Sequence, residues 1–223
     1  MIVAERKPLD EILRMIAGKK KVLVLGCGGC VTVCLTGGEK EAELLASELR
    51  IALRKNGAAA DVSCRTVTRQ CDREFNETVR KDIAASDAVL TMACGAGVQL
   101  LSEMFETAEI YPAMNTTFLG ANVAPGVWTE NCRGCGQCML AETGGICPIT
   151  RCSKGLINGT CGGTKDGKCE VSKDVDCAWY LIYKRLKTRG RLDLLMTIRP
   201  PVDWSKTSAG IRRSMTRKEM LKP

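Results

Sequence analysis

The first half of the chain alternates between short apolar runs and amphipathic segments. The apolar runs predict strands over residues 21–25, 60–67, 87–93 and 110–113. Apolar residues at helical spacing predict helices over residues 9–17, 39–55, 74–85 and 97–105. Strands and helices that alternate in this way are typical of a parallel α/β sheet with right-handed crossovers. We therefore expect a Rossmann-like α/β domain over residues 1–125.

The pattern changes from about Gly126. Glycine becomes frequent and strand periodicity disappears, which predicts a small, metal-stabilised, cysteine-rich module over residues 126–197. The last segment of this module, 178–196, has an apolar face and a basic face, so it predicts an amphipathic helix that covers the module. Pro200 and Pro201 lie near the start of a basic stretch, and we expect residues 198–223 to form an extended arm.

The composition indicates thiolate chemistry. The 223 residues include 14 cysteines and no histidine. Without histidine the chain cannot form a Ser-His-Asp triad, a Cys-His nucleophile pair or a Cys₂His₂ zinc finger. Any metal must then be bound mainly by thiolates, and these ligands select zinc or iron–sulfur clusters.

The N-terminal segment and the length of the apolar runs indicate in which cellular compartment to expect the protein. We find no secretory leader and no apolar run that approaches the length of a membrane span. We therefore expect a cytoplasmic protein without a transmembrane segment. In that compartment clustered cysteines bind metal more often than they form a disulfide framework.

The formal net charge of +8 raises the alternative of nucleic-acid binding. Two features argue against it. Ionised thiolates, which the formal charge omits, would cancel part of the excess, and aromatic residues make up only 4% of the chain, so few platforms exist for stacking bases. Much of the basic charge lies near the C-terminus, at Lys184, Arg185, Arg189, Arg191, Arg199, Arg212 and Arg213. We expect no nucleic-acid partner.

Five cysteines follow the ends of predicted strands. Ligands of parallel sheets bind beyond these carboxyl ends, so we expect a metal or cluster site there. Its candidate ligands are Cys27, Cys30 and Cys34 after the first strand, Cys71 after the second and Cys94 after the third. The spacing does not decide which four of the five bind. Cys64 lies within a predicted strand, and we expect it to be a small buried hydrophobe.

The glycine-rich loop Gly26–Cys30 allows a second interpretation. Gly26-x-Gly28 after a strand matches the start of a dinucleotide-binding fingerprint. However, Val31 stands where the third glycine belongs, and no acidic residue ends the second strand to bind a ribose. This partial motif is weak, and we expect no nucleotide cofactor.

A second group of cysteines opens with the run Cys132-x-x-Cys135-x-x-Cys138. Three thiolates at this spacing on one loop are typical of a cubane cluster. Cys147 is followed by a proline, as in ferredoxin-type ligands, although its spacing from Cys138 is longer than in ferredoxins. The remaining candidates are Cys152, Cys161, Cys169 and Cys177. The alternative is a pair of structural Cys₄ zinc sites. We favour iron–sulfur for the first set, and for the last set the pattern does not decide between iron and zinc.

Several longer motifs resemble the MetV-type family, the methylenetetrahydrofolate reductase C-terminal domain family. They are GCGGCVTVCLTGGEKEAELLASEL, MACGAGVQ, YPAMNTTFLG and NCRGCGQCMLAETGGICPITRCSKGLINGTCGGTKDGKCEV, followed by DCAW. The resemblance implies a [4Fe–4S] protein that passes electrons to the flavin of a MetF-type partner, which reduces methylenetetrahydrofolate. All 13 cysteines named above as candidates, which exclude Cys64, match cysteines of the family.

The residues and the resemblance together predict an electron-transfer subunit of a methylenetetrahydrofolate reductase complex that is not an enzyme by itself. We expect two [4Fe–4S] clusters, with Zn²⁺ as the alternative occupant of the last cysteine set. The expected partners are a MetF-type flavoprotein and an upstream electron-donor subunit. Two rival hypotheses remain: a zinc-stabilised scaffold subunit, and an electron donor to another methyl-transfer or corrinoid system.

Overall fold

The computed structural model describes residues 1–206, 213–217 and 219. The chain forms two compact units, Met1–Thr129 and Glu130–Pro223. Each unit is described by itself. The arm expected over residues 198–223, with Arg212, lies partly outside the described residues.

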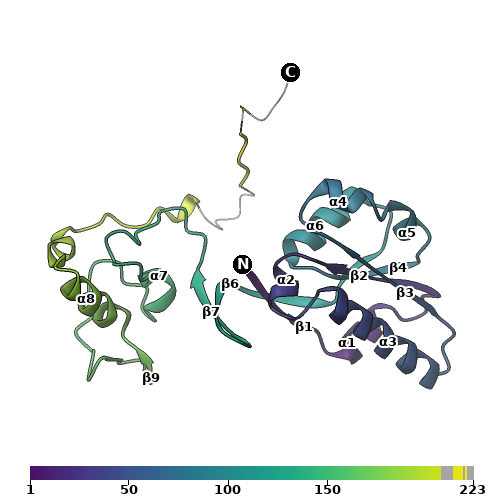
Figure 1. Ribbon diagram of the computed structural model, residues 1–223, viewed down its shortest axis with the longest axis horizontal. Coiled ribbons are helices and arrows are strands. Elements are labelled where there is room, and N and C mark those ends of the chain that lie inside the picture. Colours follow the sequence, from purple (N-terminus) through teal and green to yellow (C-terminus); the bar gives the residue numbers. More distant parts are fainter. Residues whose placement is uncertain (207–212, 218, 220–223) are drawn as a thin grey trace. The chain divides into compact units, whose positions relative to one another are not determined.

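The N-terminal unit is built on a four-stranded parallel sheet (Figure 1). Its strands lie in the order β3 (Asp61–Val67), β2 (Lys21–Cys27), β4 (Ala88–Met92) and β5 (Ile110–Pro112). The central strands β2 and β4 are apolar on both faces because helices cover both faces of the sheet. The four predicted strands are thus confirmed, and the chain is an α/β protein.

Two groups of helices cover the sheet. α1 (Leu9–Met15) and α3 (Glu39–Lys55) pack on the face that carries Val22 and Val24. The opposite face, with Leu23 and Leu25, is covered by α4 (Arg73–Glu77), α5 (Arg80–Ala84) and α6 (Gly95–Met104). A short helix, α2 (Cys30–Val33), follows β2 directly.

The strand order differs from the expected Rossmann-like one. Within this sheet the third strand, β4, lies beside the first strand, β2, and not beyond the second, β3. This order occurs in doubly wound sheets of the flavodoxin type, whereas a Rossmann half has the order 3-2-1. The order therefore reverses between β2 and β4.

The helix predicted over residues 74–85 is interrupted. It forms α4 and α5, with a tight turn in which the Val79 N–H bonds Asn76 O at 3.3 Å. Asn76 is fully buried, and its amide donates to Gln70 O at 2.8 Å. The helix breaks here because the Asn76 side chain must reach the buried Gln70 carbonyl and the Val79 side chain must be buried as well.

A second, antiparallel sheet was not predicted. It consists of β1 (Ile2–Arg6), β6 (Met114–Ala124) and β7 (Val127–Cys132), with β6 in the centre. β1 pairs with β6 and has a bulge between Val3 and Ala4. Gly126, with φ 75°, lies in the turn between β6 and β7, so strand structure continues beyond the point where the sequence pattern changes.

The C-terminal unit contains few regular elements. They are α7 (Pro148–Arg151), β8 (Lys168–Cys169), β9 (Ser172–Asp176), α8 (Ala178–Thr188) and the 3₁₀ turns η1 (Leu192–Met196) and η2 (Trp204–Lys206). β8 and β9 form an antiparallel hairpin. The small core contains Ile146, Trp179, Ile182 and Leu186, so α8 covers the unit with its apolar face.

The helix predicted over residues 178–196 ends earlier, at Thr188. Gly190 adopts φ 65°, and its N–H bonds Lys187 O while the Arg191 N–H bonds Leu186 O at 2.9 Å. These two bonds form a Schellman motif, which satisfies the last carbonyls of α8 and stops it.

The start of the predicted arm is attached to its own unit. Arg199 forms an ion pair with Glu142 at 2.5 Å, and its backbone N–H donates to Asn158 Oδ1 at 2.8 Å. Among the described helices we find none whose length and apolar character would let it span a bilayer.

Candidate functional site

Two cysteines flank the point where the strand order of the parallel sheet reverses. Cys27 is the last residue of β2, and Cys94 is the N-cap of α6, just after β4. Ligands of doubly wound sheets bind in the crevice at this switch point because the loops diverge there. The fold thus places both thiols at the edge of the sheet where we expected a site.

Cys71, after β3, lies within electrostatic reach of the same two thiols. Burial, followed by the negative charges of the Cys94 and Cys27 thiolates, raises the pKa of the Cys71 thiol. Cys71 is exposed, Cys94 is partly exposed and Cys27 is buried. Three strand ends therefore contribute to one group of thiols, and Cys30, exposed at the start of α2, lies on the loop that follows Cys27.

Cys34 has different surroundings. It is only 5% exposed and belongs to the apolar core under α3. Its Sγ atom lies 3.6 Å from Val31 O and 3.4 Å from Thr36 Oγ1. It also lines a groove with β1 residues Val3 and Ala4. Packing and polar contacts thus account for Cys34 without a metal.

Cys64 lies in β3 and packs partly against the same core, and burial raises the pKa of its thiol.

Gln70 is a site residue that the sequence analysis missed. Its side chain is fully buried, and its amide nitrogen donates to Leu25 O at 2.8 Å and to Gly26 O at 3.1 Å. Its amide oxygen accepts a hydrogen bond from the Thr91 hydroxyl, and its backbone N–H donates to Cys27 Sγ at 3.5 Å. Gln70 therefore ties the ends of β2 and β4 to the segment that carries Cys71. No spacing in the sequence distinguishes this glutamine.

In the C-terminal unit the Cys132–Cys138 run forms a loop after β7. Gly134 and Gly136 have φ 62° and 80°, which only glycine adopts readily, so the loop turns tightly. The Gly134 N–H donates to Cys132 Sγ at 3.3 Å. Cys132 and Cys138 are exposed and Cys135 is partly exposed, and Cys147 is the N-cap of α7. Hydrogen bonds from backbone N–H groups to sulfur stabilise thiolate ligands.

The four remaining cysteines surround one small cavity. Cys152, Cys161, Cys169 and Cys177 all line a space of about 20 Å³. The Thr164 hydroxyl donates to Cys177 Sγ at 2.9 Å. The Val171 N–H and the Ser153 hydroxyl lower the pKa of the Cys169 thiol, because both stabilise its thiolate. A thiolate is the form that binds metal.

The thiols lie near one another without converging on one point. Among the described residues, no three Cys, Asp or Glu side chains lie close enough to hold a metal ion. The chemistry of the donor sets nevertheless fits soft metals, since the groups contain thiols and polar N–H or O–H donors to sulfur.

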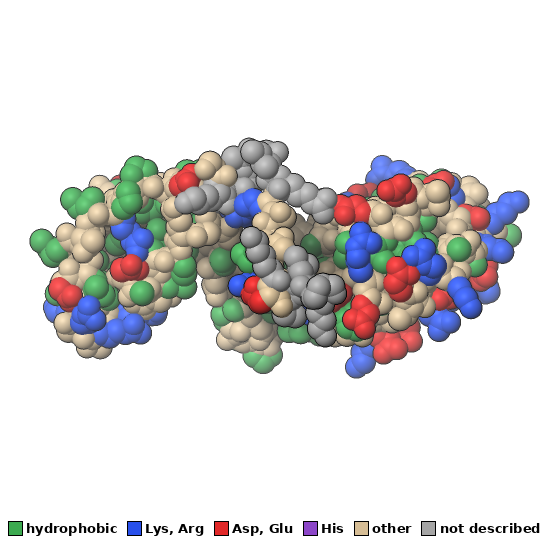
Figure 2. Space-filling model, turned by 90° about the horizontal axis from the view of Figure 1, so that it is seen from above, with side chains coloured by type: hydrophobic (Ala, Val, Ile, Leu, Met, Phe, Trp, Pro, Cys, Tyr) green, Lys and Arg blue, Asp and Glu red, His purple; other side chains and the backbone are tan. Residues whose placement is uncertain are grey.

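The surface of the N-terminal unit carries charges of both signs. Figure 2 shows lysine and arginine side chains interspersed with aspartate and glutamate on the visible face of this unit. A mixed face of this kind lacks the continuous basic track that follows a phosphate backbone.

Comparison with known proteins gives one family. Residues 111–205 match the family described as methylene-tetrahydrofolate reductase C terminal, and all eight cysteines from Cys132 to Cys177 lie within this match. The curated proteins and the solved structures gave no match. The resemblance found in the sequence is thereby confirmed over this segment, which matches the methylene-tetrahydrofolate reductase C-terminal family.

Proposed function

We propose that the chain is an iron–sulfur electron-transfer subunit of a methylenetetrahydrofolate reductase complex. It relays electrons to or from the flavin of a MetF-type catalytic partner and receives them from a separate donor subunit. The observation that carries this proposal is the gathering of Cys27, Cys71 and Cys94 from three strand ends at the switch point of the sheet. The family match links the C-terminal half of the chain to the reductase.

The first cluster site consists of Cys27, Cys71 and Cys94, with Cys30 as the fourth ligand. Cys27 and Cys34 both lie in the apolar core, but Cys27 has electrostatic contact with Cys71, whereas the Cys34 Sγ atom lies against Val31 O and Thr36 Oγ1, so we leave Cys34 out of the quartet. Gln70 holds the loops that carry Cys27 and Cys71. A [4Fe–4S] cluster, when bound, takes up and releases single electrons.

The second cluster site consists of Cys132, Cys135 and Cys138, with Cys147 as the fourth ligand. The tight turns at Gly134 and Gly136 allow backbone N–H groups to face sulfur, as the bond from Gly134 to Cys132 does. Two sites in one chain suit a relay, since electrons then have intermediate positions between donor and flavin.

The cavity lined by Cys152, Cys161, Cys169 and Cys177 fits a single ion better than a cluster. Its volume is about 20 Å³, which is only slightly more than the roughly 10–15 Å³ that one water-sized sphere requires. We therefore assign Zn²⁺ to this set, in a structural role. A zinc site stabilises a unit that has only a small apolar core.

Metal analysis and electron transfer test the proposal together. Protein purified without oxygen is analysed for iron, acid-labile sulfide and zinc, and the flavoprotein that copurifies with it is identified. We expect iron and sulfide in the amounts that two [4Fe–4S] clusters per chain require, and one zinc per chain. The partner should be a flavin-containing reductase. Zinc without iron would contradict the relay and support the scaffold alternative, and a corrinoid protein as the partner would support the third hypothesis.

A variant pair separates relay from structure. In the complex, Cys94→Ala should slow reduction of the flavin by a low-potential dye, because it removes a ligand of the first cluster. Cys64→Ala, within β3 of the same unit and away from the carboxyl ends of the strands, should leave the rate unchanged. Equal rates in the wild type and in a Cys94→Ala complex that has lost the first cluster would contradict the relay.

A further inference from the structure

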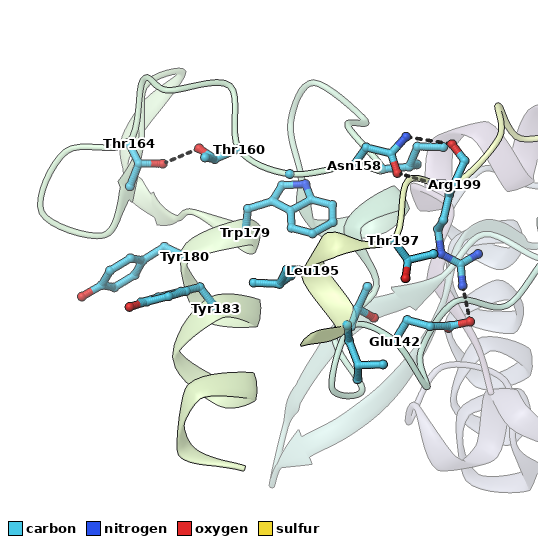
Figure 3. A pocket seen from close by; sticks show the side chains of 14 residues that line it. Glu142, Asn158, Thr160, Thr164, Trp179, Tyr180, Tyr183, Leu195, Thr197 and Arg199 are labelled. Atoms are coloured by element: carbon cyan, nitrogen blue, oxygen red, sulfur yellow. Dashed lines mark hydrogen bonds and ion pairs between the residues drawn. The ribbon is translucent and has the colours of Figure 1, made fainter. Parts of the chain in front are cut away.

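The C-terminal unit contains a second, larger cavity (Figure 3), which shares lining residues with the four-cysteine cavity. Its volume is about 340 Å³, and α8, η1 and the loops around residues 142 and 158 form its walls. Trp179, Tyr180 and Tyr183 from α8 and Leu195 from η1 give it a mainly aromatic and apolar lining. Cavities of this size and character are typical of small-molecule sites.

Trp179 offers an aromatic surface whose polar atom is already satisfied. Its Nε1–H donates to Leu156 O at 2.9 Å, so the indole needs no further hydrogen-bond partner. One face of each tyrosine, in contrast, has a lysine nearby: Lys184 Nζ lies 5.6 Å from the Tyr180 ring centre and Lys187 Nζ lies 5.9 Å from that of Tyr183. Trp179 lines the cavity although the residue as a whole is 8% exposed, and the part of its ring that borders the cavity offers an apolar surface for a planar molecule.

The opposite wall carries a carboxylate with unused acceptor capacity. Arg199 bonds one oxygen of Glu142, and Asn158 fixes the Arg199 backbone through two hydrogen bonds, as Figure 3 shows. The Oε2 atom of Glu142 is shielded from solvent and has no hydrogen-bond partner among the residues described, while 41% of the Glu142 side chain as a whole is exposed. The terminal torsion of a glutamate is soft, so a small rotation can turn an oxygen towards a bound molecule.

We propose that this cavity binds a small planar heteroaromatic molecule that stacks on Trp179 and donates an N–H from its ring edge to Glu142. The inference goes beyond the proposed function and does not depend on which metal the cysteines bind. Thr160, Thr164 and Trp179 line both cavities, so the bound molecule would lie next to the four-cysteine site.

Two probes that differ in one group test the inference. Lumiflavin is planar, fluorescent and carries a single N–H at its ring edge, and 3-methyllumiflavin lacks that donor. Each is titrated into the full-length, metal-loaded protein, and its fluorescence is followed. We expect saturable binding of lumiflavin and binding about tenfold weaker for 3-methyllumiflavin, because one hydrogen bond is lost.

Three variants locate the site. Glu142→Ala should weaken lumiflavin binding about tenfold and remove the difference between the probes. Asp193→Ala is the matched control, since Asp193 also pairs with an arginine in the same unit but does not line the cavity. It should change nothing. Thr197→Trp, at an exposed position of the wall, should fill the cavity and abolish binding.

Circular dichroism and metal content verify that each variant is folded. Absence of saturable lumiflavin binding to the wild type would overturn the inference. So would equal affinity for both probes, or binding that persists unchanged in folded Thr197→Trp protein.

Discussion

Cys34 and Cys71 belong to the same group of cysteines in the sequence but have different environments in the fold. Cys71 is exposed beside two other thiols, whereas Cys34 is buried in the core. Cys71→Ser should therefore lose the N-terminal cluster, about half of the iron, because an oxygen ligand suits a soft cluster poorly. Iron and sulfide analysis after anaerobic purification measures this loss.

The companion variant is Cys34→Ala. It removes a buried thiol and should lower stability slightly while it leaves the iron content at the wild-type level. If Cys34→Ala lost as much iron as Cys71→Ser, Cys34 would be a ligand and the assignment of Cys30 to the quartet would be wrong.

At the scale of single residues, the candidate thiols could be predicted from the sequence, but which of them are ligands could not. Residue type and position after a strand identify Cys27, Cys71 and Cys94, because strand ends of a parallel sheet meet at one edge. The difference between Cys34 and Cys30 depends on which way each side chain of a short helix faces. The role of Gln70 depends on carbonyls more than 40 positions earlier in the chain, which no local pattern indicates.

Among the helices and strands, too, some could be predicted from the sequence and others could not. The strands of the parallel sheet were predictable because buried strands are continuous apolar runs, and α3 was predicted with its observed bounds. The antiparallel sheet could not be predicted in this way, because β6 and β7 are mostly exposed or partly exposed and carry polar residues on both sides. Its central strand is stabilised by pairing with β1, from the far N-terminus of the unit, and with β7.

The start of α6 gives a prediction about packing. Gly97 lies in the first turn, and a Cβ atom added there would be 2.8 Å from Ala93 Cβ and 3.0 Å from Gln70 Cβ. Gly97→Ala should therefore destabilise the N-terminal unit by about 1–2 kcal/mol, even though alanine favours a helix. It should also lower the iron content, because Gln70 must move. Hydrogen exchange of β2 and β4 amides measures the stability.

Gly95→Ala is the control in the same turn. The added Cβ would have only Thr116 Oγ1 within 4 Å, at 3.6 Å, which is an ordinary contact. We expect unchanged or slightly higher stability, since alanine restricts the unfolded chain. Equal effects of the two substitutions would show that close packing at Gly97 does not position this end of the sheet.

At the scale of the whole molecule, the two units are stabilised differently. The N-terminal unit has two apolar clusters, one on each side of its parallel sheet. The C-terminal unit has one small cluster beneath α8, and long stretches of it have no regular structure. A unit with so little apolar burial needs cross-links, and under the proposed function metals bound by its thiols would supply them.

Cys161→Ala tests this dependence. Cys161 is exposed, so its replacement costs little in packing, and the expected effect comes from the lost zinc ligand. We expect zinc to fall to a negligible level and the amides of α8 to lose protection from hydrogen exchange. The amides of α3, in the N-terminal unit, should keep theirs, and Cys64→Ala should retain both zinc and protection. Full protection of α8 in zinc-free Cys161→Ala protein would show that the apolar contacts of Trp179, Ile182 and Leu186 suffice to hold the unit together, and that the four cysteines serve another purpose.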